Sequence, residues 1–87
     1  MSLQAVGMIE TKGLVPAIQA LDSALKASDI KYVKNWRTGS GLVCVMITGD
    51  VASVKAAVDA GVSAANRIGE VVSSEVIARP QLDISKL

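Results

Sequence analysis

The spacing of apolar residues changes several times along the chain, and these changes predict six regular elements. Apolar side chains recur at helical spacing over residues 14–27 and again over residues 51–69. Short segments rich in Val and Ile, which are typical of strands, occupy residues 3–10, 30–37, 42–48 and 71–77. The predicted order is β-α-β-β-α-β, with Thr11 and Lys12 in the first turn and a short C-terminal tail over residues 82–87.

The two predicted helices differ in composition. The first is amphipathic, with an apolar stripe formed by Leu14, Ile18, Leu21 and Leu25. The second follows an expected N-cap at Asp50 and is rich in alanine, with small side chains around much of its circumference. Small side chains let other backbones approach closely, so we expect the second helix to be packed between surfaces.

Residues 30–37 and 42–48 are joined by a short glycine-rich loop and predict a β-hairpin. The second strand is almost continuously apolar and should be buried on both faces, whereas the first mixes strand-forming residues with charge. In a regular strand Tyr32, Lys34 and Trp36 share one face. Packing of the two rings at a subunit boundary is favoured over stacking on a ligand.

The element order fits an α+β fold of the ferredoxin-like type, an antiparallel sheet with both helices on one face. With 87 residues the chain is one domain, residues 1–87, and with 2% aromatic residues its core must be thin. Cys44 is the only cysteine and histidine is absent, so neither a disulfide within the chain nor a zinc site reinforces it. Self-association is the remaining means of stabilisation.

Charge and residue inventory exclude several functions. A net charge of +1 offers no broad attraction for nucleic acid or an anionic membrane, and the absence of a signal or spanning segment predicts a soluble cytosolic protein. No nucleophile and base pair can be named, and the glycine loop lacks the lysine of a phosphate-binding loop, so we expect no enzyme and no catalytic residue. Glu10, Glu70 and Glu75 are expected to be solvated charges.

Several motifs together resemble the hexamer-forming shell proteins of bacterial microcompartments. They are AVGMIETKGL over residues 5–14, GSGLV over 39–43, GDV over 49–51, RIGEV over 67–71 and VIARP over 76–80. The resemblance covers nearly the whole chain. It implies a compact α+β shell domain whose cyclic hexamers tile edge to edge into the facets of a shell.

The resemblance also implies roles for individual residues. The loops of six subunits would converge on the symmetry axis, so that Gly39, Ser40 and Gly41 line a central pore with Arg37 and Thr38 beside them. Glycines permit close approach, and a hydroxyl with free backbone N–H groups favours small polar or anionic metabolites. By the same resemblance, Lys26 and Arg79 lie at the edges where hexamers meet.

Further expectations concern partners and location. The partners are other copies of the chain, other shell proteins and, as a further option, enclosed enzymes, and the location is the microcompartment shell in the cytoplasm. Some relatives hold an iron–sulfur cluster on a pore-loop cysteine. Since Cys44 lies beyond the loop, we expect no cluster, no metal and no cofactor.

Other readings of the sequence stay open. Lys34, Trp36, Glu75 and Ala78 depart from the common family pattern, which leaves the subtype open. A small regulatory or metabolite-binding ferredoxin-like domain is the main alternative, because this fold serves many functions. A shell component whose pore is blocked by Arg37 or Trp36 is another.

Overall fold

The computed structural model describes residues 4–78 and contains the six predicted elements in the predicted order. A single turn of 3-10 helix, η1, adds a seventh element at the tip of the hairpin. The elements are β1 (Ala5–Lys12), α1 (Leu14–Ala27), β2 (Lys31–Arg37), η1 (Gly39–Gly41), β3 (Leu42–Gly49), α2 (Val51–Asn66) and β4 (Val71–Ala78). The expected tail and Arg79 lie outside the described residues.

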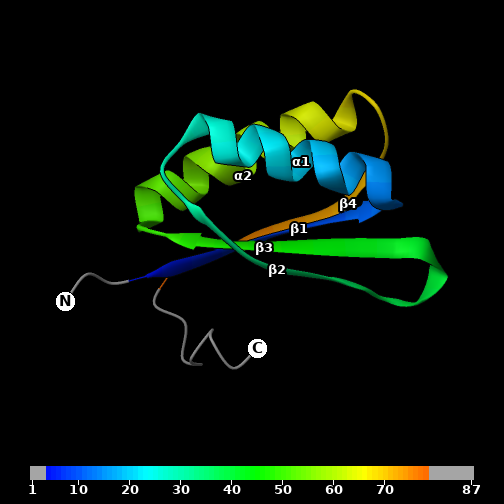
Figure 1. Ribbon diagram of the computed structural model, residues 1–87, viewed down its shortest axis with the longest axis horizontal. Coiled ribbons are helices and arrows are strands. Elements are labelled where there is room, and N and C mark those ends of the chain that lie inside the picture. The colour runs from blue at the N-terminus through cyan, green and yellow to red at the C-terminus, as the bar shows by residue number, and fades with distance from the viewer. Residues whose placement is uncertain (1–3, 79–87) are drawn as a thin grey trace.

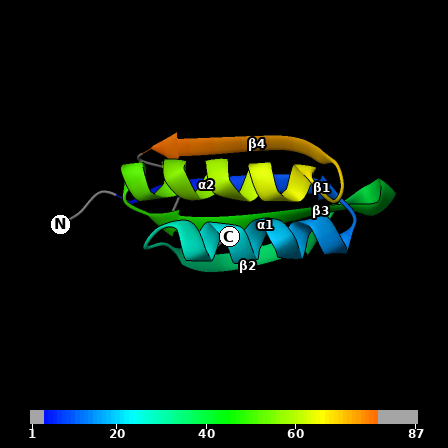
Figure 2. The same cartoon turned by 90° about the horizontal axis from the view of Figure 1, so that it is seen from above.

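The four strands form one antiparallel sheet in the order β2-β3-β1-β4. Both helices cover the same face of this sheet, as Figures 1 and 2 show. We call this the helix side, and the opposite face the open side. The arrangement confirms the ferredoxin-like α+β fold. It also places β2 and β4 at the two edges of the sheet, with the β2–β3 tip at one end of the molecule.

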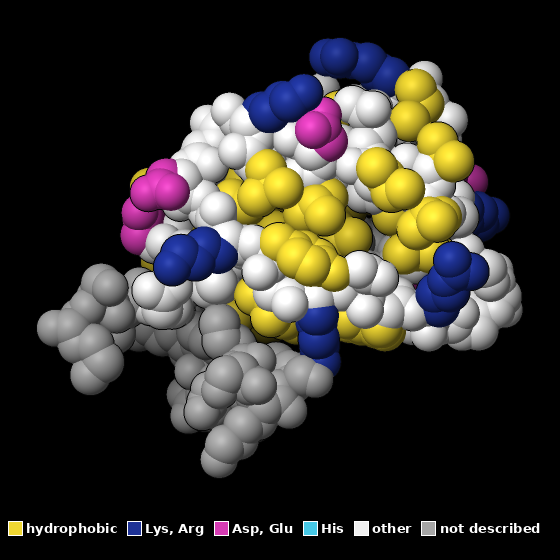
Figure 3. Space-filling model, viewed as in Figure 1, with side chains coloured by type: hydrophobic (Ala, Val, Ile, Leu, Met, Phe, Trp, Pro, Cys, Tyr) yellow, Lys and Arg dark blue, Asp and Glu magenta, His cyan; other side chains and the backbone are white. Residues whose placement is uncertain are grey.

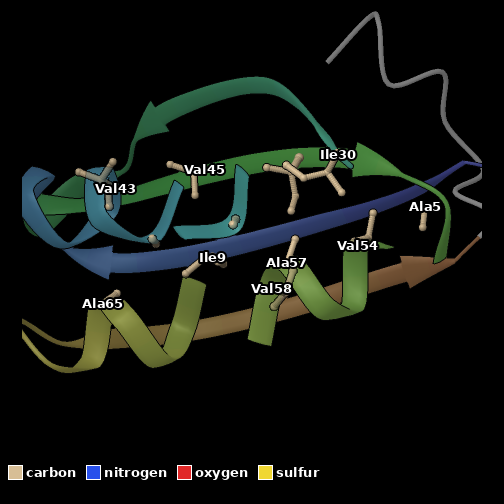
Figure 4. Packing of buried hydrophobic residues seen from close by; sticks show 13 residues of the cluster. Ala5, Ile9, Ile30, Val43, Val45, Val54, Ala57, Val58 and Ala65 are labelled. Atoms are coloured by element: carbon tan, nitrogen blue, oxygen red, sulfur yellow. The ribbon is translucent and has the colours of Figure 1, made fainter. Parts of the chain in front are cut away.

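The core between sheet and helices is built from small and branched side chains (Figure 4). Ile9, Ile47 and Val54 are its largest fully buried apolar members, and most of the rest are alanine or valine. The small residues let the layers approach closely. A Cβ atom on Gly61 would lie 2.8 Å from the carbonyl oxygen of Ala20, so the two helices touch at this glycine.

β1 ends later in the chain than the sequence predicted. Thr11 and Lys12 were expected in a turn, but they pair with Val43 and Leu42 of β3. Thr11 is fully buried, and its hydroxyl donates to the Gly13 carbonyl at 2.9 Å, which allows a polar side chain to continue the strand. The turn itself is confined to Gly13, whose φ of 90° favours glycine.

α2 begins where predicted and ends earlier. The Asp50 carboxylate accepts the Ser53 backbone N–H at 2.9 Å and confirms the expected N-cap. The helix ends at Asn66 rather than continuing to residue 69, and the side-chain oxygen of Asn66 accepts the Val71 backbone N–H at 3.3 Å. This bond leads the chain into β4.

α1 faces the opposite way from the usual amphipathic helix. The residues that it buries are Pro16, Ala17, Ala20 and Ala24. The large residues of the predicted apolar stripe are only partly covered or lie in solvent: Leu21 is partly buried against the core, while Leu14 and Leu25 are each 44% exposed and Ile18 is 57% exposed. The spacing correctly predicted the helix, but its apolar stripe is not the face that packs on the sheet.

Candidate pore loop and assembly surfaces

The predicted pore residues lie together at the tip of the β2–β3 hairpin. Two backbone bonds fix the tip: the Thr38 N–H donates to the Leu42 carbonyl at 3.0 Å, and the Gly13 N–H donates to the Gly41 carbonyl at 2.9 Å. Ser40 and Gly41 have positive φ angles of 68° and 76°. All residues from Arg37 to Gly41 are exposed, so the tip projects from the domain on a hydrogen-bonded base.

The register of β2 decides on which side of the sheet the side chains next to the loop lie. Arg37 is opposite Val43, a residue of the core, and so lies on the helix side. Trp36 is opposite Cys44 and lies on the open side. Within residues 4–78, Arg37 takes part in no salt bridge. Its guanidinium is therefore available to a solute at the tip.

The expected sharing of one face by Tyr32, Lys34 and Trp36 is wrong. A bulge leaves Val33 without a pairing partner, so Tyr32 is opposite Ile47 while Lys34 is opposite Met46. The extra residue turns the strand by one position. Tyr32 therefore lies on the helix side, where its hydroxyl accepts a hydrogen bond from the Asn35 side chain.

On the open side near the loop, several charged side chains contact neighbouring side chains. The Lys34 ammonium lies 5.3 Å from the centre of the Trp36 ring, within range of a cation–π interaction. Lys12 forms a salt bridge with Glu70 at 3.6 Å, and the Glu10 carboxylate accepts a hydrogen bond from the Ser73 hydroxyl at 3.2 Å. The three glutamates expected as solvated charges are all at least partly exposed.

A shallow hollow of about 130 Å³ lies on the same side, lined by Met8, Glu10, Cys44, Ser73, Ser74 and Glu75. Cys44 is buried at its floor as predicted. Burial and, to a smaller extent, the Glu10 carboxylate raise the pKa of the Cys44 thiol, which keeps it protonated and unreactive at neutral pH. Among residues 4–78 there is no cluster of three potential metal-binding side chains.

Lys26, the predicted edge residue, lies near the end of α1 that is remote from the loop. Its ammonium pairs with Asp22 at 3.0 Å, and both side chains are well exposed. β4 ends at the same end of the molecule, since Ala78 pairs with Ala5. Arg79 is the next residue in the chain but is not among those described.

Two flanks of the domain expose large apolar side chains, a feature that the sequence analysis missed. The first is formed by α1 with the adjoining edge strand β2, and Figure 3 shows hydrophobic side chains gathered there. Its members are Leu14, Val15, Ile18, Leu25 and Tyr32. The second is formed by β4 and the turn before it, with Ile68, Val72 and Ile77 exposed. Such surfaces in a small domain mark contacts with other molecules.

A thin-cored domain with exposed apolar flanks and a projecting glycine loop defines a small α+β protein that functions through assembly. The chain belongs to the BMC domain family, whose profile matches residues 5–80. It is similar to the bacterial microcompartment shell protein PduA of Citrobacter freundii, with 48% identity over 87 residues that cover 100% of this chain and 94% of the relative.

Two other relatives agree with this assignment. The bacterial microcompartment shell protein EutM of Escherichia coli is 51% identical over 85 residues, covering 98% of this chain and 88% of the relative. The crystal structure of a microcompartment protein from Desulfitobacterium hafniense superimposes with a TM-score of 0.81 and 27% identity. The match covers 90% of this chain and 42% of the other chain. The chain is therefore a structural subunit of a bacterial microcompartment shell.

Within residues 4–78 no helix has the length and apolarity needed to cross a membrane.

Proposed function

We propose that the chain, as one domain, forms cyclic hexamers that tile into shell facets and carry a central pore for small polar or anionic metabolites. The partners are further copies of the chain and other shell proteins, with enclosed enzymes behind the facet. The chain has no histidine, and its one cysteine is buried and protonated, which supports a role without catalysis.

The observation that carries the hexamer proposal is the outward position of the large apolar residues of α1. Val15 is 68% exposed and Ile18 57% exposed, although shorter alanines of the same helix are buried. The second apolar flank lies on β4, at the other edge of the sheet. Two different flanks on opposite edges suit a head-to-tail contact, in which the first flank of one subunit covers the second flank of the next. Repeated by rotation, such a contact closes a ring.

The geometry of the loop supports its place on the axis of that ring. A Cβ atom placed on Gly39 or Gly41 would meet no atom within 4 Å beyond the neighbouring residues in the chain, so the tip stands clear of its own domain. Six such tips could converge without rearrangement. The Ser40 hydroxyl and the exposed backbone would offer hydrogen bonds, and Arg37 would add positive charge beside the opening. Together these groups favour small polar or anionic solutes over apolar ones.

Tiling is assigned to the opposite end of the domain, with Lys26 and Arg79 as edge residues. The expected effect of Lys26→Ala is that hexamers stay intact while extended sheets are lost, because Lys26 is remote from the loop and from the core. Native mass spectrometry measures the particle mass, and electron microscopy of concentrated samples shows whether sheets form. Asp22→Asn is the matched control, since it removes the intrahelical partner of Lys26 but keeps the ammonium.

The same measurements, together with a measurement of solute passage through the hexamer, decide between the shell pore and the alternative of a regulatory or metabolite-binding domain. Particles of six subunits with an open axis support the shell pore. Stable monomers, dimers or trimers without sheets would refute the hexamer and favour ligand binding by a smaller assembly. Hexamers that tile but pass no solute would support the structural role in the shell and refute the proposed pore.

A further inference from the structure

We infer that the proposed pore is electrically polar, with a cationic mouth on the helix side of the sheet and a neutral to anionic mouth on the open side. This inference rests on the proposed hexamer with the loop at its axis. It extends that proposal, because it assigns different charge to the two ends of the pore and names the residues responsible.

The helix side carries an excess of positive charge at the loop end of the domain. Arg37 lies on this side, next to the loop, and is exposed without a salt-bridge partner among residues 4–78. α1 begins beside the loop at Leu14, has no acidic residue in its first turn and no capping side chain, so its partial positive charge adds to that of Arg37. α2 ends at the same end, and the exposed Arg67 is its C-cap residue.

The open side near the loop has a different balance. Between the row of Met8 and Met46 and the loop end of the sheet, the charged residues of this side are Lys12, Lys34, Glu10, Glu70 and Glu75. Two lysines against three glutamates leave a net charge of −1 on this side, compared with +1 on the helix side, where Arg37 and Arg67 outweigh Asp59 of α2. On this side the Lys12 ammonium is bound to Glu70, and the Lys34 ammonium lies over the Trp36 ring.

Sixfold repetition would turn these differences into two rings of opposite sign. Rings of like charge around a narrow opening of low dielectric concentrate counterions more strongly than isolated surface charges do. Anions would gather at the helix-side mouth, drawn by the Arg37 ring. The open-side mouth would repel them weakly through its excess carboxylates. A pore with this pattern conducts best when anions enter through the cationic mouth and cations through the other.

Single-pore current measurements on hexamers inserted in a planar bilayer test this inference, with potassium chloride on both sides. Each wild-type pore should pass at least about twofold more current at one voltage polarity than at the other. This ratio of the two currents should grow as the salt is diluted, because the screening length rises from about 10 Å at 0.1 M to about 30 Å at 0.01 M. Arg37→Gln should bring the ratio close to one. Lys55→Gln, which removes a charge from the exposed face of α2 at its other end, should leave the ratio unchanged.

A second variant keeps the test valid if Arg37→Gln does not assemble. Glu70→Gln frees Lys12 on the open side and should lower the ratio without lowering the total conductance. Wild-type hexamers with equal currents at both polarities would overturn the inference of opposite charge at the two mouths, but the proposal of a conducting pore would stand. An Arg37→Gln hexamer that keeps the wild-type ratio would also overturn it. Six-subunit particles that never conduct would instead refute the pore itself.

Discussion

The two helices of the domain lie side by side on the same sheet, yet they distribute their side chains in opposite ways. α2 points Val54 and Val58 into the core, and its outward positions carry alanine or polar residues. α1 points Ala17, Ala20 and Ala24 into the core. Its large apolar residues are exposed, apart from Leu21, which is partly buried against the core. The large apolar side chains are thus inside on one helix and outside on the other.

This contrast separates two kinds of packing. The inward valines of α2 serve the stability of the single subunit, because they fill the space above β1. The outward residues of α1 contribute little to that core, and exposing them costs solubility. Their natural place is against a second subunit. The contrast therefore predicts that substitutions on α1 act on assembly, whereas substitutions where the helices touch act on folding.

The largest expected effect is on assembly. Ile18→Asp should convert hexamers to monomers while the far-ultraviolet circular dichroism spectrum stays that of the wild type. The side chain is exposed in the subunit, but a carboxylate placed in an apolar contact costs several kcal/mol, roughly the cost of burying an unpaired polar group. Analytical ultracentrifugation measures the change.

Ala56→Asp is the control for that variant. It places the same charge on the outward face of α2, where no large apolar residue is exposed, and should keep the hexamer. If Ile18→Asp still assembled into hexamers, the α1 flank would not be the subunit contact.

An intermediate effect is expected where the two helices touch. Gly61→Ala should lower the free energy of unfolding by about 1–3 kcal/mol, the usual cost of overpacking, because the added methyl group would press on the Ala20 carbonyl and on Ile9. Urea unfolding at a fixed protein concentration measures the loss. Ser63→Ala, on the exposed face of the same helix, should change stability by less than about 0.5 kcal/mol. Equal stability of the two variants would mean that the helices can move apart without cost.

The smallest effect concerns the start of each helix, since α2 has a side-chain cap and α1 has none. Hydrogen bonds from the Ser53 N–H and hydroxyl lower the pKa of Asp50 below that of a free aspartate. A lowered pKa in the folded state means stability that is complete above the pKa of the unfolded chain and lost as pH falls through the folded value. Asp50→Ala should therefore lower the Tm at neutral pH, and the difference from wild type should shrink in acid.

Asp50→Asn separates the cap from its charge. Asparagine also caps helices, so at neutral pH the Tm of this variant should stay close to that of the wild type. In acid the variant should lack the part of the Tm decrease that comes from protonation of Asp50. Thermal unfolding by circular dichroism at a series of pH values provides both measurements. A difference between wild type and Asp50→Ala that stayed constant into acid would show that the charge of Asp50 does not contribute.

The sequence predicted the element order, the sheet type and the hairpin, because these follow from local spacing and turn residues. It did not predict which side of α1 faces the sheet, since a helix with alanines on one side and leucines on another has two apolar faces. The decision depends on the tight approach of α2 at Gly61, which only the tertiary structure reveals.

The site was predicted in part for a related reason. The candidate pore residues are consecutive in the chain, so a motif was enough to collect them at one tip, while their role in a pore stays a prediction. The sides on which Tyr32 and Trp36 lie depend on the unpaired Val33, and no turn residue or glycine marks that bulge in the sequence. The pairing of Lys12 with Glu70 depends on the return of β4 beside β1, a contact between distant parts of the chain.

The bulge at Val33 has a consequence for how this strand tolerates changes in length. Val33 is the one position of β2 that the ladder does not use, so its deletion would remove a residue and leave every remaining side chain on its present face. Insertion of one residue into the regular part of β2 between the bulge and the tip would instead move side chains on one side of the insertion to the opposite face of the sheet. In β2, the loss of the bulge residue therefore leaves the facing of the hairpin side chains unchanged, while substitutions near the tip vary its charge.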